Sequence, residues 1–247
     1  IKTNQWDEAR PGYLESDTVA HCGESLLGEF VYTVDFIDIA TSWTEQRAVW
    51  GKGETGVLKQ IQDVEDSLPF PLLGFDADNG SEFLNHHLLR HFTERDKPVQ
   101  FTRSRPYHKD DNAHVEQKNW THVRQWFGYH RLDKQVLVGL MNNLYSQEWN
   151  LYHNFFLPSV KLVEKKLVDG KQIKRYDTPK TPYQRVLESP YVAASVKRDL
   201  KEQLETLNPF RLKKAMENKL KTIFKICYRK KPFVTIPLTK LLPGNIY

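Results

Sequence analysis

The chain has 247 residues, with 36 Lys or Arg and 31 Asp or Glu, and so carries a net charge of +5. That length suits one well-cored domain and a smaller appendage. Its two cysteines, Cys22 and Cys227, support neither a disulfide scaffold nor a cysteine-built zinc site, and without a signal segment or an apolar run of roughly 18 residues we expect a soluble, intracellular protein.

The first seventy residues predict an antiparallel meander followed by a helix. Residues 14–22 and 29–40 are rich in β-branched and aromatic residues, and the segment between them, GESLLG, has two glycines that suit a hairpin turn. Residues 41–51 predict a third strand. From Glu54 the apolar residues recur at helical spacing, and this pattern stops before Pro69.

The next segments alternate between strand and helix. PLLGFDAD (71–78) predicts a short buried strand, residues 81–96 a helix that Ser81 opens, and PVQFTRS (98–104) another strand. This alternation favours a parallel section of sheet. The polar run 105–112 predicts a loop, a helix follows from about Asn112, and a long helix over 133–156 is expected to be capped by Asp133.

The C-terminal third predicts a hairpin and basic helices. Asp169-Gly170 lies between two alternating segments, which is typical of a hairpin turn. Residues 197–231 hold twelve Lys or Arg against four acids. Such a stretch suits a polyanion binder or, with equal weight, a solvated helix face. We therefore divide the chain into a polar lead (1–12), an α/β core (13–156) and a C-terminal hairpin with basic helices (157–247), and the start at Ile1 predicts a fragment of a longer protein.

Three acids occupy the boundaries of predicted elements. Asp17 lies in the first strand, Asp78 directly follows a buried strand, and Glu116 lies early in the helix after the polar loop. Carboxylates brought together in this way form a site of hard oxygen ligands that suits Mg²⁺ or Mn²⁺. Taken singly, each acid also has an ordinary role, as a turn former, a solvated helix residue or an edge-strand charge.

The sequence motifs around these acids resemble those of a known family. DADNGSEF (76–83) and TRSRPYHKDDNAHVEQKNW (102–120) are similar to signatures of the integrase catalytic core found in bacterial insertion-sequence transposases and retroviral integrases. SDTVAHCG (16–23) looks like the family's first-acid strand, and TPYQRVL (181–187) resembles a downstream segment of these transposases. The resemblance covers about residues 10–190.

The resemblance implies an RNase H-like mixed sheet and a triad of acids, Asp17, Asp78 and Glu116, that hold two Mg²⁺ or Mn²⁺ ions. Between Asp78 and Glu116 lie 37 residues (116 − 78 − 1), slightly more than the family's commonest 35, and the loop from Tyr107 to Asp111 has room for the difference. The implied activity is transposition: DNA cleavage and strand transfer between element ends and a target. The family further implies a homo-oligomer on DNA, no membrane or small-molecule substrate, and a place at the bacterial nucleoid.

Further residues receive weaker roles from the same resemblance. Asn79 and Gly80 would shape the active-site turn. Asn112 would position the loop or a nucleotide, or would cap the helix. His114 would approach the metal site or the DNA, or would have a structural role alone. Candidate DNA contacts are Asn119, Arg124, Lys213, Lys214, Arg229, Lys230 and Lys231. Val123 stands where many relatives have a lysine, which puts the exact contacts in doubt.

Alternatives remain open at this stage. Asp35 and Asp38 on the second strand compete with Asp17 as the first ligand, while His86, His87 and His91 are interpreted as packing or surface residues. The alternative functions are a catalytically silent DNA-binding protein of the same fold and another RNase H-like nuclease.

Overall fold

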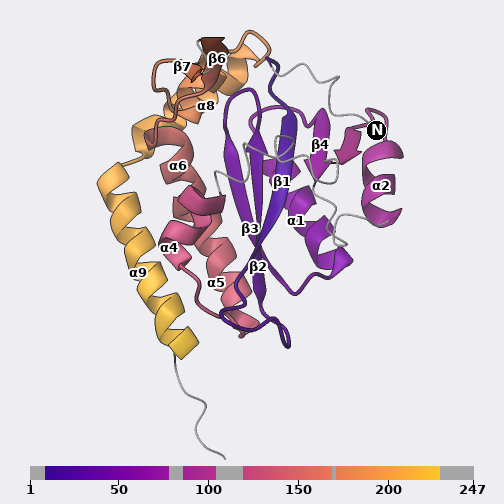
Figure 1. The fold of residues 1–247 in the computed structure, drawn as a ribbon, viewed down its shortest axis with the longest axis vertical. Helices are drawn as coiled ribbons and strands as arrows, with labels where there is room; N and C mark the ends of the chain where they lie inside the picture. The colour runs from indigo at the N-terminus through magenta and orange to yellow at the C-terminus, as the bar shows by residue number, and fades with distance from the viewer. Residues whose placement is uncertain (1–8, 78–85, 104–118, 169–170, 229–247) are drawn as a thin grey trace, which may run out of the picture.

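The computed structural model describes residues 9–77, 86–103, 119–168 and 171–228, in which a mixed sheet is covered by helices on both faces (Figure 1). The strand order is β3-β2-β1-β4-β5. The strands are β1 (Tyr13–Ala20), β2 (Val31–Asp38), β3 (Thr44–Trp50), β4 (Gly74–Ala77) and β5 (Gln100–Arg103). β1, β2 and β3 pair antiparallel, whereas β1, β4 and β5 run parallel. The predicted meander, parallel section and RNase H-like α/β fold are therefore confirmed.

The helices lie close to the predicted segments. They are α1 (Glu54–Ser67), α2 (His86–Thr93), the π-helix η1 (Asn119–Arg124), α4 (Gln125–Phe127), α5 (Val136–Leu144), the π-helix η2 (Tyr145–Trp149), α6 (Asn150–Phe156), α7 (Pro182–Glu188), α8 (Ala194–Thr206) and α9 (Pro209–Tyr228). None of the helices in the described residues is both long and apolar enough to cross a bilayer. The predicted Asp133 cap is wrong, because α5 has Gln135 at its N-cap without a side-chain bond. Asp133 lies instead 3.6 Å from the Arg131 guanidinium Nε.

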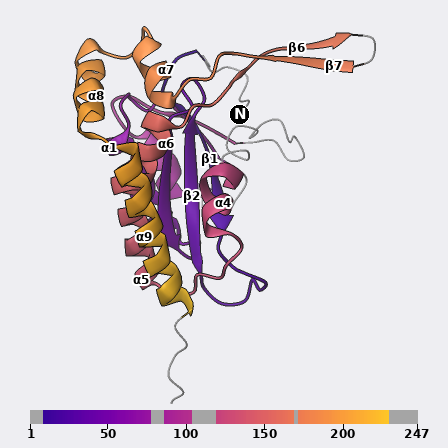
Figure 2. The same cartoon turned by 90° about the vertical axis from the view of Figure 1, so that its left-hand side faces the viewer.

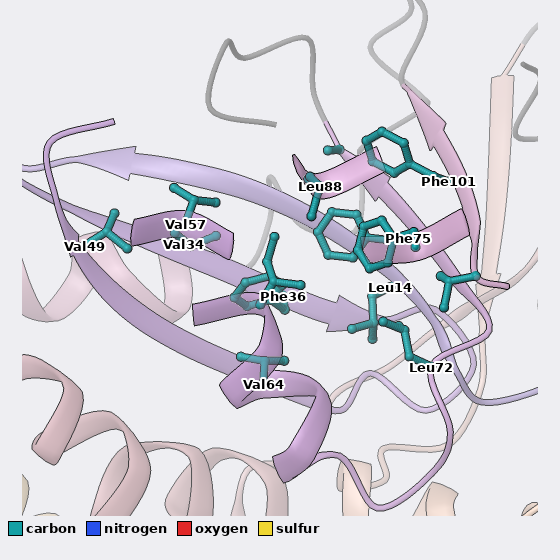
Figure 3. Packing of buried hydrophobic residues seen from close by; sticks show 14 residues of the cluster. Leu14, Val34, Phe36, Val49, Val57, Val64, Leu72, Phe75, Leu88 and Phe101 are labelled. Atoms are coloured by element: carbon teal, nitrogen blue, oxygen red, sulfur yellow. The ribbon is translucent and has the colours of Figure 1, made fainter. Parts of the chain in front are cut away.

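One sheet face is covered by α1 and α2. Successive strand residues point to opposite faces, so Leu14 of β1, Phe36 of β2 and Phe75 of β4 share this face, where α1 contributes Val57 and α2 contributes Leu88 (Figure 3). All five side chains are almost completely buried. This core fixes β4 beside β1, so β4 ends at Ala77 opposite Ser16, in the middle of β1.

The opposite face carries a second core that includes the C-terminal helix. Val19 of β1 and Leu137 of α5 belong to one buried cluster with Met216, Leu220 and Ile223 of α9. Because these three apolar residues recur at helical spacing, one side of α9 packs on the body of the protein and the other side faces solvent. α9 is therefore attached along an apolar stripe, and its cations Arg211, Lys213, Lys214, Lys221 and Lys225 are exposed.

Gly12 joins the starts of β1 and β4. Its N–H donates to the Asp38 carboxylate Oδ1 over 2.7 Å, and its carbonyl accepts from the backbone N–H groups of Leu73 (2.8 Å) and Gly74 (3.1 Å). Its φ is +117°, and an added Cβ would lie 2.4 Å from the Pro71 carbonyl oxygen. Only glycine meets both conditions without strain, because it has no Cβ and adopts positive φ readily.

The outer edge of the sheet at β3 is closed by two asparagines. The Asn154 side chain accepts from Thr44 N–H over 2.9 Å and donates to Thr44 C=O over 2.8 Å. Asn142 makes the same pair of bonds with Ala48, at 2.6 and 3.0 Å. Each side-chain amide thus makes the backbone bonds that a residue of a neighbouring strand would make. The N–H and C=O groups of Thr44 and Ala48 are therefore not available to pair with a strand of another chain.

The predicted C-terminal hairpin is present as β6 (Leu162–Val168) and β7 (Lys171–Tyr176). It forms a separate two-stranded sheet. Figure 2 shows it extending away from the helix and sheet layers, toward the side of the molecule on which α4 lies and opposite α9. The hairpin is therefore an arm rather than a part of either core.

Candidate metal and nucleic-acid site

Asp17 lies on the central strand of the sheet. Its side chain is half buried, Oδ1 accepts from the backbone N–H of Thr18 over 2.7 Å, and Oδ2 accepts from the Asn119 side-chain Nδ2 over 2.6 Å. The two hydrogen bonds fix the direction in which both carboxylate oxygens point. The first predicted ligand is therefore held as an oriented carboxylate on a rigid element.

The strand register places the residue before Asp78 opposite the residue before Asp17. β1 and β4 are parallel, and Ser16 pairs with Ala77. Ser16 immediately precedes Asp17, and Ala77 immediately precedes Asp78. Asp78 itself lies outside the described residues. The described pairing places its neighbour opposite the neighbour of Asp17, as a shared carboxylate site requires.

The helix after the predicted loop also reaches Asp17. Asn119, the first residue of η1, makes the 2.6 Å bond to Asp17, although the two residues are 102 positions apart. Glu116 precedes Asn119 by three positions and lies outside the described residues. The contact places Asn119, three positions after Glu116 in the sequence, at the strand that carries Asp17.

A divalent cation fits the chemistry of Asp17, but the described residues hold only part of a ligand set. Within them, no group of three or more His, Cys, Asp or Glu side chains could hold a metal ion. A carboxylate oxygen is the ligand that Mg²⁺ and Mn²⁺ prefer. Asp78 and Glu116 lie outside the described residues, so the predicted triad stays a prediction.

Two buried acids near Asp17 were missed by the sequence analysis. Glu15 of β1 and Asp76 of β4 pair across the parallel strands, with exposed fractions of 4% and 1%. Asp76 accepts from the Thr102 hydroxyl on β5 over 2.5 Å. The signal was the spacing of two in Glu15-x-Asp17 and Asp76-x-Asp78, since residues two apart on a strand share a face. This face of β1 and β4 is thus rich in carboxylates, and a nearby cation would offset their repulsion.

The competing acids of β2 have structural roles. Asp35 is fully buried opposite Asp17 and accepts from the Gln46 amide over 2.6 Å. Asp38 accepts from Gly12 N–H and, over 2.7 and 2.6 Å, from the Thr41 N–H and hydroxyl, so it closes the turn after β2. Burial raises the pKa of Asp38 to about 6, while these bonds and Lys161 oppose the rise.

A buried polar chain lies beyond Asp17 at the end of β1. His21 Nε2 lies 2.8 Å from the Thr33 hydroxyl, which lies 2.8 Å from the Tyr145 hydroxyl on η2. Burial, with a smaller effect from Arg124, lowers the pKa of His21 to about 3. His21 is therefore neutral at physiological pH and links β1, β2 and η2.

The other predicted residues differ in whether the structure describes them and in the contacts they make. Arg124 donates to the backbone carbonyls of Ala20 (3.0 Å) and Gly128 (3.3 Å), and its guanidinium lies 4.7 Å from the centre of the Tyr129 ring, so its described contacts join η1 to β1. Lys213 and Lys214 are exposed on α9. His91 contacts Glu65, with 3.2 Å between Nε2 and Oε2. The predicted residues Asn79, Gly80, Asn112, His114, Arg229, Lys230 and Lys231 lie outside the described residues.

This chain is similar in sequence to a protein without an assigned activity, and solved structures have a distant likeness to its fold. No protein family's sequence model matches the chain. The uncharacterized protein y4rM of Sinorhizobium fredii is 41% identical over 180 residues, which is 73% of this chain and 51% of that protein. The chain thus spans about half the length of this curated relative.

Two solved structures of viral origin have a distant likeness to this chain. The catalytic core domain of BIV integrase has 12% identity and a TM-score of 0.40, covering 59% of this chain and 84% of that one. A simian T-cell lymphotropic virus intasome, in complex with the PP2A regulatory subunit B56 gamma, has 13% identity and a TM-score of 0.42, covering 69% and 68%. Values this low do not define a function.

Proposed function

We propose that this chain is the catalytic core of a transposase or integrase that cleaves DNA and transfers strands with divalent metal ions. Asp17, Asp78 and Glu116 would hold two Mg²⁺ or Mn²⁺ ions. The observation that carries the proposal is the position of Asp17. Asn119 binds its carboxylate, and the β1–β4 register sets Ser16 opposite Ala77. Ala77 directly precedes Asp78 and Asn119 follows Glu116 by three positions, so the described neighbours of both acids support the proposal.

The protein's own contribution is to orient oxygen ligands. Thr18 and Asn119 fix the orientation of the Asp17 carboxylate, and the buried β1–β4 pair supplies a rigid base. When bound, the metal ions would activate the attacking oxygen and stabilise the leaving oxygen of an in-line displacement. No protein nucleophile is needed in this scheme.

The proposed reaction has two balanced steps. In the first, a water oxygen bonds to phosphorus at the element's end and the 3′-oxygen departs, taking a proton and leaving a 5′-phosphate. In the second, that 3′-hydroxyl bonds to a phosphorus of the target DNA and the target's own 3′-oxygen leaves with the proton. The number of phosphodiester bonds is conserved in the second step, so no energy source is consumed.

The test is nicking of supercoiled plasmid DNA, and joining of a labelled 3′-hydroxyl duplex to it, by the full chain with Mg²⁺ or Mn²⁺. Asp78→Asn should lower both activities by roughly 100-fold or more, because a lost metal ligand removes several kcal/mol of transition-state stabilisation. Asp66→Asn, an exposed acid on α1, is the matched control and should leave them unchanged. Normal strand transfer by Asp78→Asn with Mg²⁺ would disprove the assignment.

The same assay separates the two alternative functions. A catalytically silent DNA-binding protein would bind the duplex and never nick it with either metal. Another RNase H-like nuclease would cut RNA–DNA hybrids or junctions without joining the 3′-hydroxyl end to the plasmid. The proposal therefore requires both nicked and joined products.

A further inference from the structure

The β6–β7 hairpin is a charged arm whose surroundings in the described residues do not explain its composition. It carries five cations, Lys165, Lys166, Lys171, Lys174 and Arg175, against the two acids Glu164 and Asp169. It forms its own two-stranded sheet and extends away from the body (Figure 2). A hairpin of two strands is at best marginally stable alone in water, so an extended arm of this kind is expected to work against a partner.

The strand register brings two lysines together on one face. Lys165 and Lys174 are direct cross-strand partners, so their side chains leave the ribbon on the same side, with Cβ atoms about 5 Å apart. Both are exposed, and among the described residues neither forms an ion pair with an acid. Like charges directly opposite each other destabilise a hairpin. A bound anion would convert this repulsion into attraction.

The opposite face is balanced differently. Glu164 forms an ion pair with Lys166, with 2.7 Å between Oε1 and Nζ, and Arg175 pairs with Glu164 across the strands. Among the paired residues of the two strands, the face of Lys165 and Lys174 carries no acid, whereas Glu164 lies on the other face. The exposed apolar residues are divided between the faces: Leu162, Leu167 and Tyr176 share the face of these two lysines, and Ile173 lies on the other face with Lys166. Two facing cations with no acid on their own face favour a polyanion as the partner.

We propose that the β6–β7 hairpin is a DNA-binding arm in which Lys165 and Lys174 contact backbone phosphates of duplex DNA. The ligand class rests on the proposed function, since that function makes DNA the polyanion at hand. A two-stranded ribbon fits the width of the major groove. The arm points toward the side of the molecule that carries α4 (Figure 2), and α4 continues η1, whose Asn119 binds Asp17. DNA held by the arm is thus on the side of the helix that reaches the candidate site.

The proposal shifts the principal DNA contact away from the basic C-terminal helix. On α9, Lys219 lies 2.6 Å from the Asn143 side-chain oxygen and also forms an ion pair with Glu148, so part of that helix's charge serves packing. Lys213 and Lys214 remain exposed on the same helix. Hairpin and helix variants can therefore be compared directly within one chain.

The experiment is fluorescence anisotropy of the full chain with a labelled duplex in EDTA, measured over a range of salt concentrations. Lys165→Gln with Lys174→Gln should weaken binding roughly 10- to 100-fold near 0.1 M salt and lower the slope of log K against log salt by about 2, because each phosphate contact releases about 0.9 of a counterion. Arginine at both positions should restore the binding. The control pair is Lys59→Gln with Lys201→Gln, two exposed lysines on α1 and α8 that should change binding little.

The outcomes separate this inference from its alternatives. Unchanged binding and slope in the hairpin variant would overturn it, and an equal loss in the control pair would reduce it to a net-charge effect and overturn it as well. If Leu167→Ser with Ile173→Ser dissociated an oligomer in sedimentation while the lysine variant still bound DNA, the arm would contact a second copy of this chain instead. Misfolding does not explain a loss, because removing opposed lysine charges should stabilise the hairpin. Since EDTA removes all metal chemistry, failure here leaves the nicking test unaffected.

Discussion

Asn154 closes the edge of the sheet, and its replacement by leucine tests that role. Leucine has a similar volume, so the main loss is the pair of bonds that the amide makes with the Thr44 N–H (2.9 Å) and C=O (2.8 Å). Thr44 is completely buried and Asn154 is 1% exposed, so water has little access to the two backbone groups. Leaving each group unsatisfied costs about 1 to 3 kcal/mol. We expect Asn154→Leu to lower the free energy of unfolding by about 2 to 6 kcal/mol.

The assay is urea denaturation followed by tryptophan fluorescence. Asn143→Ala is the matched control, because Asn143 is exposed one residue after Asn142 and its side chain accepts one bond, from Lys219 over 2.6 Å. It should cost less than about 1 kcal/mol. Light scattering adds a second readout, since an unsealed edge strand invites pairing between chains. If Asn154→Leu cost no more than Asn143→Ala and stayed monodisperse, the edge would not depend on this amide.

Three further predictions concern the site and the second core. Asn119→Ala should cost about 1.5 to 3 kcal/mol in urea unfolding, the usual loss for a hydrogen bond to a charged group, and should lower plasmid nicking; a variant with unchanged nicking would separate Asn119 from the site. For His21 the folded pKa (about 3) lies below the ordinary 6.5, so the unfolded chain binds the proton first and stability falls as pH drops below 6.5. Between pH 7 and pH 4 this contributes a loss of about 3 kcal/mol, which His21→Gln should remove from the unfolding free energy measured by urea titration at each pH; equal pH dependence in both proteins would contradict the assignment. Asp38 opposes this trend, since its raised pKa makes the fold gain stability as pH falls from about 6 toward 3.8. Leu220→Ala on α9 should cost about 2 to 5 kcal/mol by burial lost in the second core, whereas exposed Lys221→Ala should fall within about 0.5 kcal/mol; similar thermal midpoints for the two would show that α9 does not belong to that core.

Much of the fold followed from local patterns. The alternation of apolar residues in 29–40, the helical spacing from Glu54 and the Asp169-Gly170 turn are each encoded within a dozen residues, and the corresponding elements β2, α1 and the β6–β7 hairpin are present. Local sequence was less informative about caps. Asp133 has the side chain of an N-cap residue, yet α5 begins later, with Gln135 at its N-cap, and Asp133 lies near Arg131, whose guanidinium bonds the carbonyls of Cys22, Ser25 and Leu27.

The amino-acid sequence alone indicated the kind of chemistry to look for. The acids at 17, 78 and 116 and the words around them resemble the integrase core, and the meander with its parallel strands is present in the sheet. The folded chain was needed to learn which acids have other partners: Asp38 closes a turn with Gly12 and Thr41, Asp35 is bonded by Gln46, and Asp17 is reached by Asn119. This is because a carboxylate's role depends on burial and on donors that come from distant parts of the chain. Those distances are fixed by strand register and helix packing, which no short segment specifies alone.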